Sequence, residues 1–223
     1  MEELASLVGV SAIAPDLPGH GPEPHLPATM GEAVERVVDV AGGVEVLVGY
    51  SMGGRIALRA ASHLADLQAL VVISAGQGIP DERLGERRLA DDRLAEHVES
   101  TPLESFVDEW MALPMFAGLR ALDEARWVAD RAMRLEGTSG GLAASLRGMG
   151  QGVVGRVPDD VVAGLDVELH AMAGALDPAY VGAAEQLVAT ASRGRLHIHP
   201  RAGHAVVGED PGFVARVVAS VLP

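Results

Sequence analysis

The sequence contains no cysteine among its 223 residues, and this absence excludes several kinds of site at once. Without thiols the chain can form no disulfide, no thiolate metal site and no cysteine nucleophile. The absence also fits a reducing compartment. The first residues lack the positive region and the apolar stretch of a signal peptide, so we expect a cytoplasmic protein.

Lysine is absent as well, and the 17 basic residues are all arginine, against 31 acidic residues. The resulting formal net charge of −14 repels phosphate backbones, so a nucleic-acid partner is not expected. No apolar run approaches the roughly 20 residues that a membrane-spanning helix requires, and we therefore expect no membrane insertion. The sequence shows neither metal-ligand spacing nor a nucleotide fingerprint, which leads us to expect no metal and no other cofactor.

Short apolar runs alternate with helical patterns along the chain, which predicts parallel strands joined by crossover helices. We expect strands at 11–15, 44–48, 69–74, 168–173 and 195–199, and helices near 30–40, 53–64, 180–191 and 210–221. The stretch from 81 to about 146 has helical patterning without a convincing strand, which is typical of an inserted helical lid. The predicted α/β domain is therefore a single one, with core parts at 1–80 and 148–223 and a lid at 81–147.

The strongest motif is Gly49-Tyr50-Ser51-Met52-Gly53, which follows a strand of the buried type and opens a helical segment. This strand–turn–helix context is the one that a nucleophile elbow requires, because the sharp turn raises the serine oxygen above the sheet. We expect the glycines at 49 and 53 to leave room for that turn. The Met52 amide, at the helix N-terminus, can donate to an oxyanion. The alternative is a glycine-rich turn that happens to contain a serine.

A serine nucleophile needs a base, and the base needs an orienting carboxylate. After such an elbow the acid and the histidine follow in that order. His204 lies just past the last predicted strand, and Asp177 follows the strand at 168–173, so we predict these two partners for Ser51. The alternatives are that Asp177 only caps the next helix and that Asp166, at the other end of the strand, is the acid. The remaining late histidines lie within strands and are interpreted as structural: His170, His197 and His199.

Four stretches carry a resemblance to known proteins, at 16–21, 49–55, 110–117 and 201–205. Together they resemble the α/β-hydrolase superfamily across nearly the whole chain. Within it, the sequence is most similar to the 2-succinyl-6-hydroxy-2,4-cyclohexadiene-1-carboxylate synthases of the menaquinone pathway. The lid stretch at 110–117, together with Arg55 directly after the elbow, discriminates best. The resemblance implies the α/β-hydrolase fold, a mostly parallel sheet with crossover helices and a helical lid.

The family eliminates pyruvate from 2-succinyl-5-enolpyruvyl-6-hydroxy-3-cyclohexene-1-carboxylate, a small polycarboxylate. The resemblance implies that Ser51, activated by His204 and Asp177, abstracts a proton and that enolpyruvate then leaves. Family members hold the substrate carboxylates with arginines, which pair bidentately with them. The matching positions for substrate binding are Arg55, Arg87, Arg93 and Arg134, with Tyr50 and Trp110 lining the pocket.

A plainer interpretation of the lid arginines remains open. Residues 81–100 carry four arginines beside seven acids, which is also typical of a solvated helix face. Arg87 and Arg93 are six residues apart and point about 120° away from each other on one ideal helix. For both to face one pocket, the helix must bend or break between them.

Full-length members of the family begin with further strands and an oxyanion loop before the region where this chain starts. We therefore expect an N-terminally truncated form of the fold, in which an unpaired sheet edge favours self-association. A start site assigned too late and a degenerate paralogue are two explanations. Two alternatives to the lyase stay open: a general serine hydrolase of esters, lactones or thioesters, and a non-catalytic or degenerate paralogue. The retained serine, aspartate and histidine argue against the second.

Overall fold

The computed structural model describes residues 2–22, 24–122 and 124–222, and the chain divides into two compact units. The first unit contains the residues up to Ala14, Val37–Gln77 and the chain from Val157 on. The second contains Pro15–Arg36 and Gly78–Arg156. The predicted lid at 81–147 falls wholly within the second unit. That unit also takes in 15–36, 78–80 and 148–156, which the sequence pattern places in the core.

The first unit is built on a four-stranded sheet in which every pair of neighbours is parallel. The strands lie side by side in chain order, so their carboxyl ends share one edge of the sheet. Tyr50 lies opposite Ile73, and Ile73 lies opposite Met172. Four of the five predicted strands are confirmed, the first of them beginning two residues later than expected: β1 (Val46–Tyr50), β2 (Ala69–Ile73), β3 (Glu168–Gly174) and β4 (Gly194–His199).

The predicted strand at 11–15 is wrong. These residues form neither a strand nor a helix, and the side chain of Ile13 is 67% exposed. An apolar alternation gives a strand only where a neighbouring ladder supplies hydrogen-bond partners. Within the described parts of the chain, the only ladder partner of β1 is β2, and the segment at 11–15 has none.

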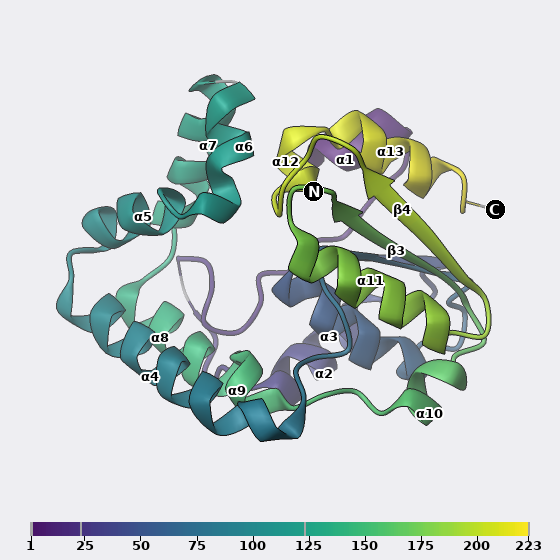
Figure 1. Ribbon diagram of the computed structural model, residues 1–223, viewed down its shortest axis with the longest axis horizontal. Coiled ribbons are helices and arrows are strands. Elements are labelled where there is room, and N and C mark those ends of the chain that lie inside the picture. Colours follow the sequence, from purple (N-terminus) through teal and green to yellow (C-terminus); the bar gives the residue numbers. More distant parts are fainter. Residues whose placement is uncertain (1, 23, 123, 223) are drawn as a thin grey trace. The chain divides into compact units, whose positions relative to one another are not determined.

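Helices cover both faces of the sheet, which makes the first unit a three-layer α/β structure (Figure 1). On one face, α3 packs on β1 and β2 while α11 packs on β3 and β4. On the other face α1 packs against α13, and both contribute to the second apolar cluster. Their bounds are α1 (Glu2–Val8), α3 (Met52–Ala60), α11 (Pro178–Thr190) and α13 (Pro211–Ala219). Shorter helices complete the unit: η1 (Ala61–His63), α10 (Asp159–Ala163) and α12 (Val206–Glu209).

The β2 segment shows why a continuous apolar run becomes a central strand. Its five residues are all buried. Leu70 and Val72 enter the cluster beneath α3 and α11, whereas Val71 and Ile73 enter the cluster beneath α1 and α13. Side chains alternate along a strand, so burial on both faces requires an apolar residue at every position. Each such side chain contributes about 1.5–3 kcal/mol of transfer free energy.

The second unit is helical, as predicted from the stretch between 81 and 146. Its core is an apolar cluster formed by α4, α5 and α8, including Val98, Phe106 and Met111. The buried carboxylate of Asp91 accepts a hydrogen bond from the Gly152 amide at 3.1 Å, which fastens α9 to α4. The helices are η2 (Asp81–Arg83), α4 (Leu84–Ser100), α5 (Leu103–Met111), η3 (Pro114–Phe116), α6 (Ala117–Leu122), α7 (Glu124–Leu135), α8 (Ser139–Met149) and α9 (Gln151–Val154). The remaining helix, α2 (Met30–Val40), has the predicted bounds and contributes to both units.

None of the helices in the described ranges combines the length and the apolar character that crossing a membrane would need.

Candidate active site

The turn between β1 and α3 places Ser51 at the carboxyl edge of the sheet. Tyr50 ends the strand and Met52 begins the helix, so a single residue makes the whole turn. Ser51 has φ 51° and ψ −111°, a backbone conformation that a residue with a side chain adopts only when its surroundings impose it. Its amide donates to the Ile73 carbonyl at 2.8 Å, which extends the ladder one residue beyond the strand.

Two glycines make the turn possible. A Cβ at Gly49 would collide with the Gly53 carbonyl oxygen and lie 2.7 Å from the Gly54 Cα. A Cβ at Gly54 would lie 2.7 Å from the Cβ of Ala75. A Cβ at Gly53 would meet nothing within 4 Å. The prediction that glycine leaves room for the turn is therefore confirmed at 49 and wrong at 53. The second close approach is at Gly54, because that helical position faces the segment after β2.

This difference predicts opposite effects of alanine at two neighbouring glycines. Gly49→Ala should lower the free energy of unfolding by about 1–3 kcal/mol or more, because backbone atoms stand where the methyl group must go. Gly53→Ala should raise it by about 0.5–1 kcal/mol, because alanine is the better helix former and its methyl group has space. Urea unfolding of both variants checks the pair. Equal stability of the two would contradict this account of the turn.

A chain of two hydrogen bonds joins Ser51 to a histidine and a carboxylate of the same unit. The Nε2 atom of His204 lies 3.0 Å from the Ser51 Oγ, and its Nδ1 atom lies 2.8 Å from Asp177 Oδ2. The side chain of His204 is 2% exposed and that of Asp177 is 18% exposed. Both distances are within the range for proton transfer between a nucleophile, a base and its orienting acid.

The geometry also distinguishes between the two roles considered for Asp177. The residue occupies the N-cap position of α11, but its side chain makes no capping hydrogen bond there. Its carboxylate is instead directed to His204. The other candidate acid, Asp166, has a side chain that is 98% exposed and faces Arg193 at 3.6 Å.

The protonation of His204 depends on opposing influences. Burial lowers the pKa of His204 below its ordinary value, because the charged imidazolium loses its hydration. The hydrogen bond and the negative charge of Asp177, and the charge of Glu209, act in the opposite direction. The net shift is downward, so the imidazole is neutral near pH 7 and can accept a proton.

Four further residues surround His204, through ring contacts or hydrogen bonds, and only one of them is singled out by the sequence. The ring of Tyr180, at the start of α11, lies 4.6 Å from the His204 ring, and that of Tyr50 lies 5.6 Å away. Ser74 donates from Oγ to the His204 carbonyl at 2.8 Å. The Gly203 amide donates to both carboxylate oxygens of Glu209, at 3.1 and 3.0 Å. Only Tyr50 is named from the sequence, and there as a residue that lines the substrate pocket. The usable signals for Ser74 and Glu209 are their places just after β2 and within α12.

Replacing Glu209 with glutamine separates the effect of its negative charge on His204 from the effect of its hydrogen bond with Gly203. Glutamine keeps an oxygen that can accept from Gly203, but the negative charge that raises the His204 pKa is lost. The pKa of His204 should therefore fall. Since the base must be neutral, the acid limb of the pH–rate profile should move to lower pH. Glu185→Gln removes the same charge at an exposed position on α11 and should leave the limb in place; equal movement in both variants would contradict the assignment.

The predicted substrate-binding residues divide between the two units. Tyr50 and Arg55 belong to the unit that contains Ser51, and the Arg55 amide donates to the Ser51 carbonyl at 3.2 Å. In the helical unit, Trp110 stacks against Phe106 with ring centroids 6.1 Å apart. Arg134, paired with Asp130 at 2.8 Å, lies 5.0 Å over the ring of Phe116, which also neighbours Trp110.

The two arginines of α4 do not share a direction. Arg87 bonds to the buried carboxylate of Asp91 at 2.7 Å, and Arg93 is exposed. The helix is continuous from Leu84 to Ser100, so the bend that would let both arginines face one ligand is not present. About 120° separates their directions around the helix axis.

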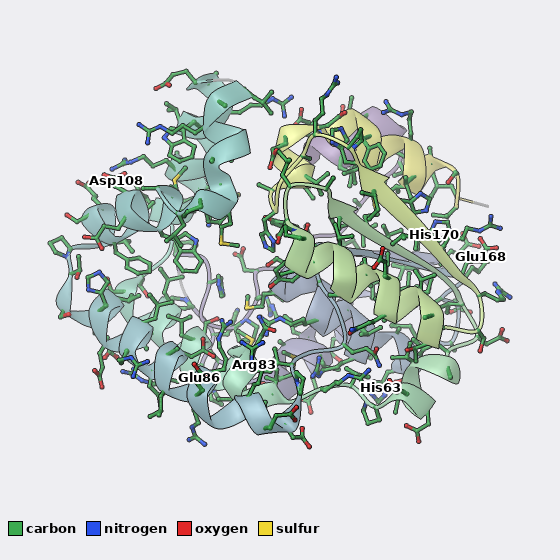
Figure 2. The ribbon with its side chains drawn as sticks, in the orientation of Figure 1. His63, Arg83, Glu86, Asp108, Glu168 and His170 are labelled. Atoms are coloured by element: carbon green, nitrogen blue, oxygen red, sulfur yellow. The ribbon has the colours of Figure 1, made fainter. Side chains whose placement is uncertain are left out.

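The histidines interpreted as structural contact one another and the sheet. His170 on β3 is labelled in Figure 2 with Glu168, near the beginning of the strand. Its Nδ1 lies 2.9 Å from Nε2 of His197, and the two rings stack. His199 bonds to Asp210 at 3.1 Å. Each of the three side chains thus has a contact that does not involve Ser51, although the buried Nε2 of His170 has no hydrogen-bond partner among the described residues.

Comparison with known proteins agrees with this architecture. The model of the alpha/beta hydrolase family matches residues 2–217. A 2-succinyl-6-hydroxy-2,4-cyclohexadiene-1-carboxylate synthase from Enterobacter sp. (strain 638) is 32% identical over 216 residues, covering 93% of this chain and 80% of that protein. A second curated relative, from Bacillus subtilis (strain 168), is 33% identical over 184 residues; the match covers 79% of this chain but 65% of that protein's length.

A solved structure supports the same relationship. MenH from S. aureus superposes with a TM-score of 0.86 at 25% sequence identity, covering 93% of this chain and 81% of that one. The chain therefore belongs to the alpha/beta hydrolase family, with 2-succinyl-6-hydroxy-2,4-cyclohexadiene-1-carboxylate synthases among its relatives.

Proposed function

We propose that this chain is a lyase that eliminates pyruvate from 2-succinyl-5-enolpyruvyl-6-hydroxy-3-cyclohexene-1-carboxylate. The observation that carries the chemistry is the hydrogen-bonded series Ser51–His204–Asp177. The imidazole in its middle is buried, and this burial lowers the pKa of His204. The choice of reaction is supported by the name of the relatives that are about one-third identical.

In the proposed reaction Ser51 acts as the base that touches the substrate. As its own proton moves to Nε2 of His204, the Ser51 oxygen removes a proton from a ring carbon. The electron pair left behind forms a carbon–carbon double bond, and the bond to the enolpyruvyl oxygen breaks. The proton taken from the ring carbon restores the serine hydroxyl. Enolpyruvate takes the proton from His204 and becomes pyruvate, which restores the neutral imidazole.

Two further groups of the same unit complete this mechanism. The negative charge of Asp177 stabilises the imidazolium that forms while the proton is in transit, as in other Ser–His–Asp systems. The amide of Met52, the first residue of α3, is proposed to donate to negative charge that develops on the substrate.

We assign the binding of the substrate carboxylates to arginines. We propose that Arg55 pairs with a substrate carboxylate and that Tyr50 contacts the ring. Substrate binding by residues of the helical unit stays a prediction from the sequence; these residues are Trp110, Arg134 and an arginine of α4. Because Arg87 and Arg93 diverge around α4, only one of these two is expected to contact the substrate.

A serine hydrolase is the second candidate, because the same three side chains can instead form an acyl-enzyme on Ser51. Purified chain should be assayed for pyruvate release from the cyclohexene substrate, coupled to lactate dehydrogenase, and for hydrolysis of p-nitrophenyl acetate. Pyruvate release that Ser51→Ala abolishes supports the lyase. Ester hydrolysis without pyruvate release overturns it in favour of a hydrolase, and neither activity above the Ser51→Ala background indicates a non-catalytic protein.

A further inference from the structure

Two serines occupy equivalent and unusual positions on neighbouring strands. Among the described residues, Ser51 and Ser74 alone combine a side chain with a positive φ, at 51° and 47°. Tyr50 lies opposite Ile73, so each serine is the first residue beyond the carboxyl end of its strand. The Ser74 amide donates to the Met172 carbonyl at 2.8 Å, just as the Ser51 amide donates to Ile73.

The backbone of Ser74 lies in a region that residues with a side chain rarely adopt. Glycine adopts this backbone region without strain, whereas a residue with a Cβ pays for it in conformational energy. Strained residues of this kind persist where the surrounding structure imposes them, and they concentrate at functional sites. Ser74 is fully buried, and its Oγ donates to the main-chain carbonyl of His204 at 2.8 Å. The hydroxyl is thus placed on the backbone of the residue whose ring bonds Ser51.

His204 is consequently fixed from two directions. Its ring is held between Ser51 Oγ and the Asp177 carboxylate, and its backbone is held by Ser74. Ser51, at the end of β1, contacts the His204 ring, and Ser74, at the end of the neighbouring β2, contacts the His204 backbone. The Ser74 bond thus connects the His204 backbone to the same edge of the sheet that carries Ser51.

We infer that Ser74 is a positioning residue, which keeps Nε2 of His204 within hydrogen-bond distance of Ser51. This inference rests on the proposed function of Ser51 as the reactive group. Ser74 does not touch the substrate; it acts through His204. Loss of its hydroxyl should let the imidazole move without altering the binding of substrate.

Ser74→Gly is the informative variant, because glycine removes the hydroxyl and also relieves the backbone strain. We expect kcat to fall by about 10–100-fold with KM unchanged, since small displacements of a catalytic group have effects of this size. Reaction of Ser51 with a fluorophosphonate probe should slow by a similar factor. Ser220→Ala is the matched control, because Ser220 also donates from Oγ to a main-chain carbonyl, that of Val217 at 2.7 Å.

The probe separates the failure of this inference from that of the proposed function. If the wild type labels at Ser51 and Ser74→Gly labels equally fast while remaining folded, the positioning role is overturned and the function stands. If the wild type labels no faster than Ser51→Ala, both are overturned. If Ser74→Gly unfolds, Ser74→Cys takes its place, because cysteine keeps the size of the side chain but is only a weak donor. An altered imidazole N–H proton resonance of the His204–Asp177 bond in this variant supports the role, and an unaltered one overturns it.

Discussion

Replacing Ser51 with alanine is expected to reduce kcat by about 10⁴–10⁶-fold, the range found when a triad serine is removed from other enzymes. The reason is local. His204 Nε2 lies 3.0 Å from the Ser51 oxygen, and alanine leaves the imidazole without the group through which it acts. The loss applies to elimination and to ester hydrolysis alike, because both need the serine oxygen. Rates of product formation at saturating substrate, measured against buffer, provide the test.

Ser62→Ala is the matched control for this experiment. Ser62 belongs to the same unit but is exposed, in the short helix that follows α3. Its replacement should leave kcat within a factor of about two, as is usual for surface substitutions away from a site. A Ser51→Ala protein that folds and retains more than a tenth of the wild-type rate would remove Ser51 from the mechanism.

Asp177→Asn is expected to lower kcat by about 10⁴-fold, with little change in the free energy of unfolding. Asparagine keeps the shape of the side chain but removes the charge that stabilises the imidazolium, and it favours the wrong tautomer of the ring. Stability should change little through α11, because the Asp177 side chain makes no capping bond there. The pKa of His204 should also fall, since Asp177 raises it. The remaining activity should therefore persist to lower pH than that of the wild type.

Asp166→Asn is the control for the loss of one carboxylate near β3. Asp166 is the alternative acid suggested by the chain order, and its side chain is almost fully exposed beside Arg193. We expect wild-type kcat and an unchanged pH profile. A large loss of kcat in Asp166→Asn, together with a small one in Asp177→Asn, would reverse the assignment of the acid.

Much of the site could be predicted because its signals are short in sequence. The elbow at Gly49–Gly53 shows its strand, its turn and its helix within a dozen residues. Asp177 and His204 each follow a strand end, and parallel strands bring their carboxyl ends to one edge. The fully apolar β2 segment likewise indicates a central strand, since only burial on both faces explains five apolar residues in a row.

Other features depended on contacts between distant parts of the chain. The segment at 11–15 has the pattern of a strand, but it finds no ladder partner and its Ile13 is exposed. The motif favours Gly53 over Gly54, and only the approach of Ala75 shows that Gly54 is the one that needs to be glycine.

The sequence by itself indicated the family, the four strands of the sheet and the three residues Ser51, His204 and Asp177, which the structure joins by two hydrogen bonds. Periodicity and turn chemistry are local properties, so they can be recognised without knowing which distant segments pack against them. The tertiary structure decided the register that sets Ser74 beside Ser51, 23 positions away in the chain. It also decided the contact of Ser74 with His204 across 130 positions. Such contacts are selected by the packing of the whole sheet, because a hydroxyl has no partner until the fold brings a carbonyl within reach.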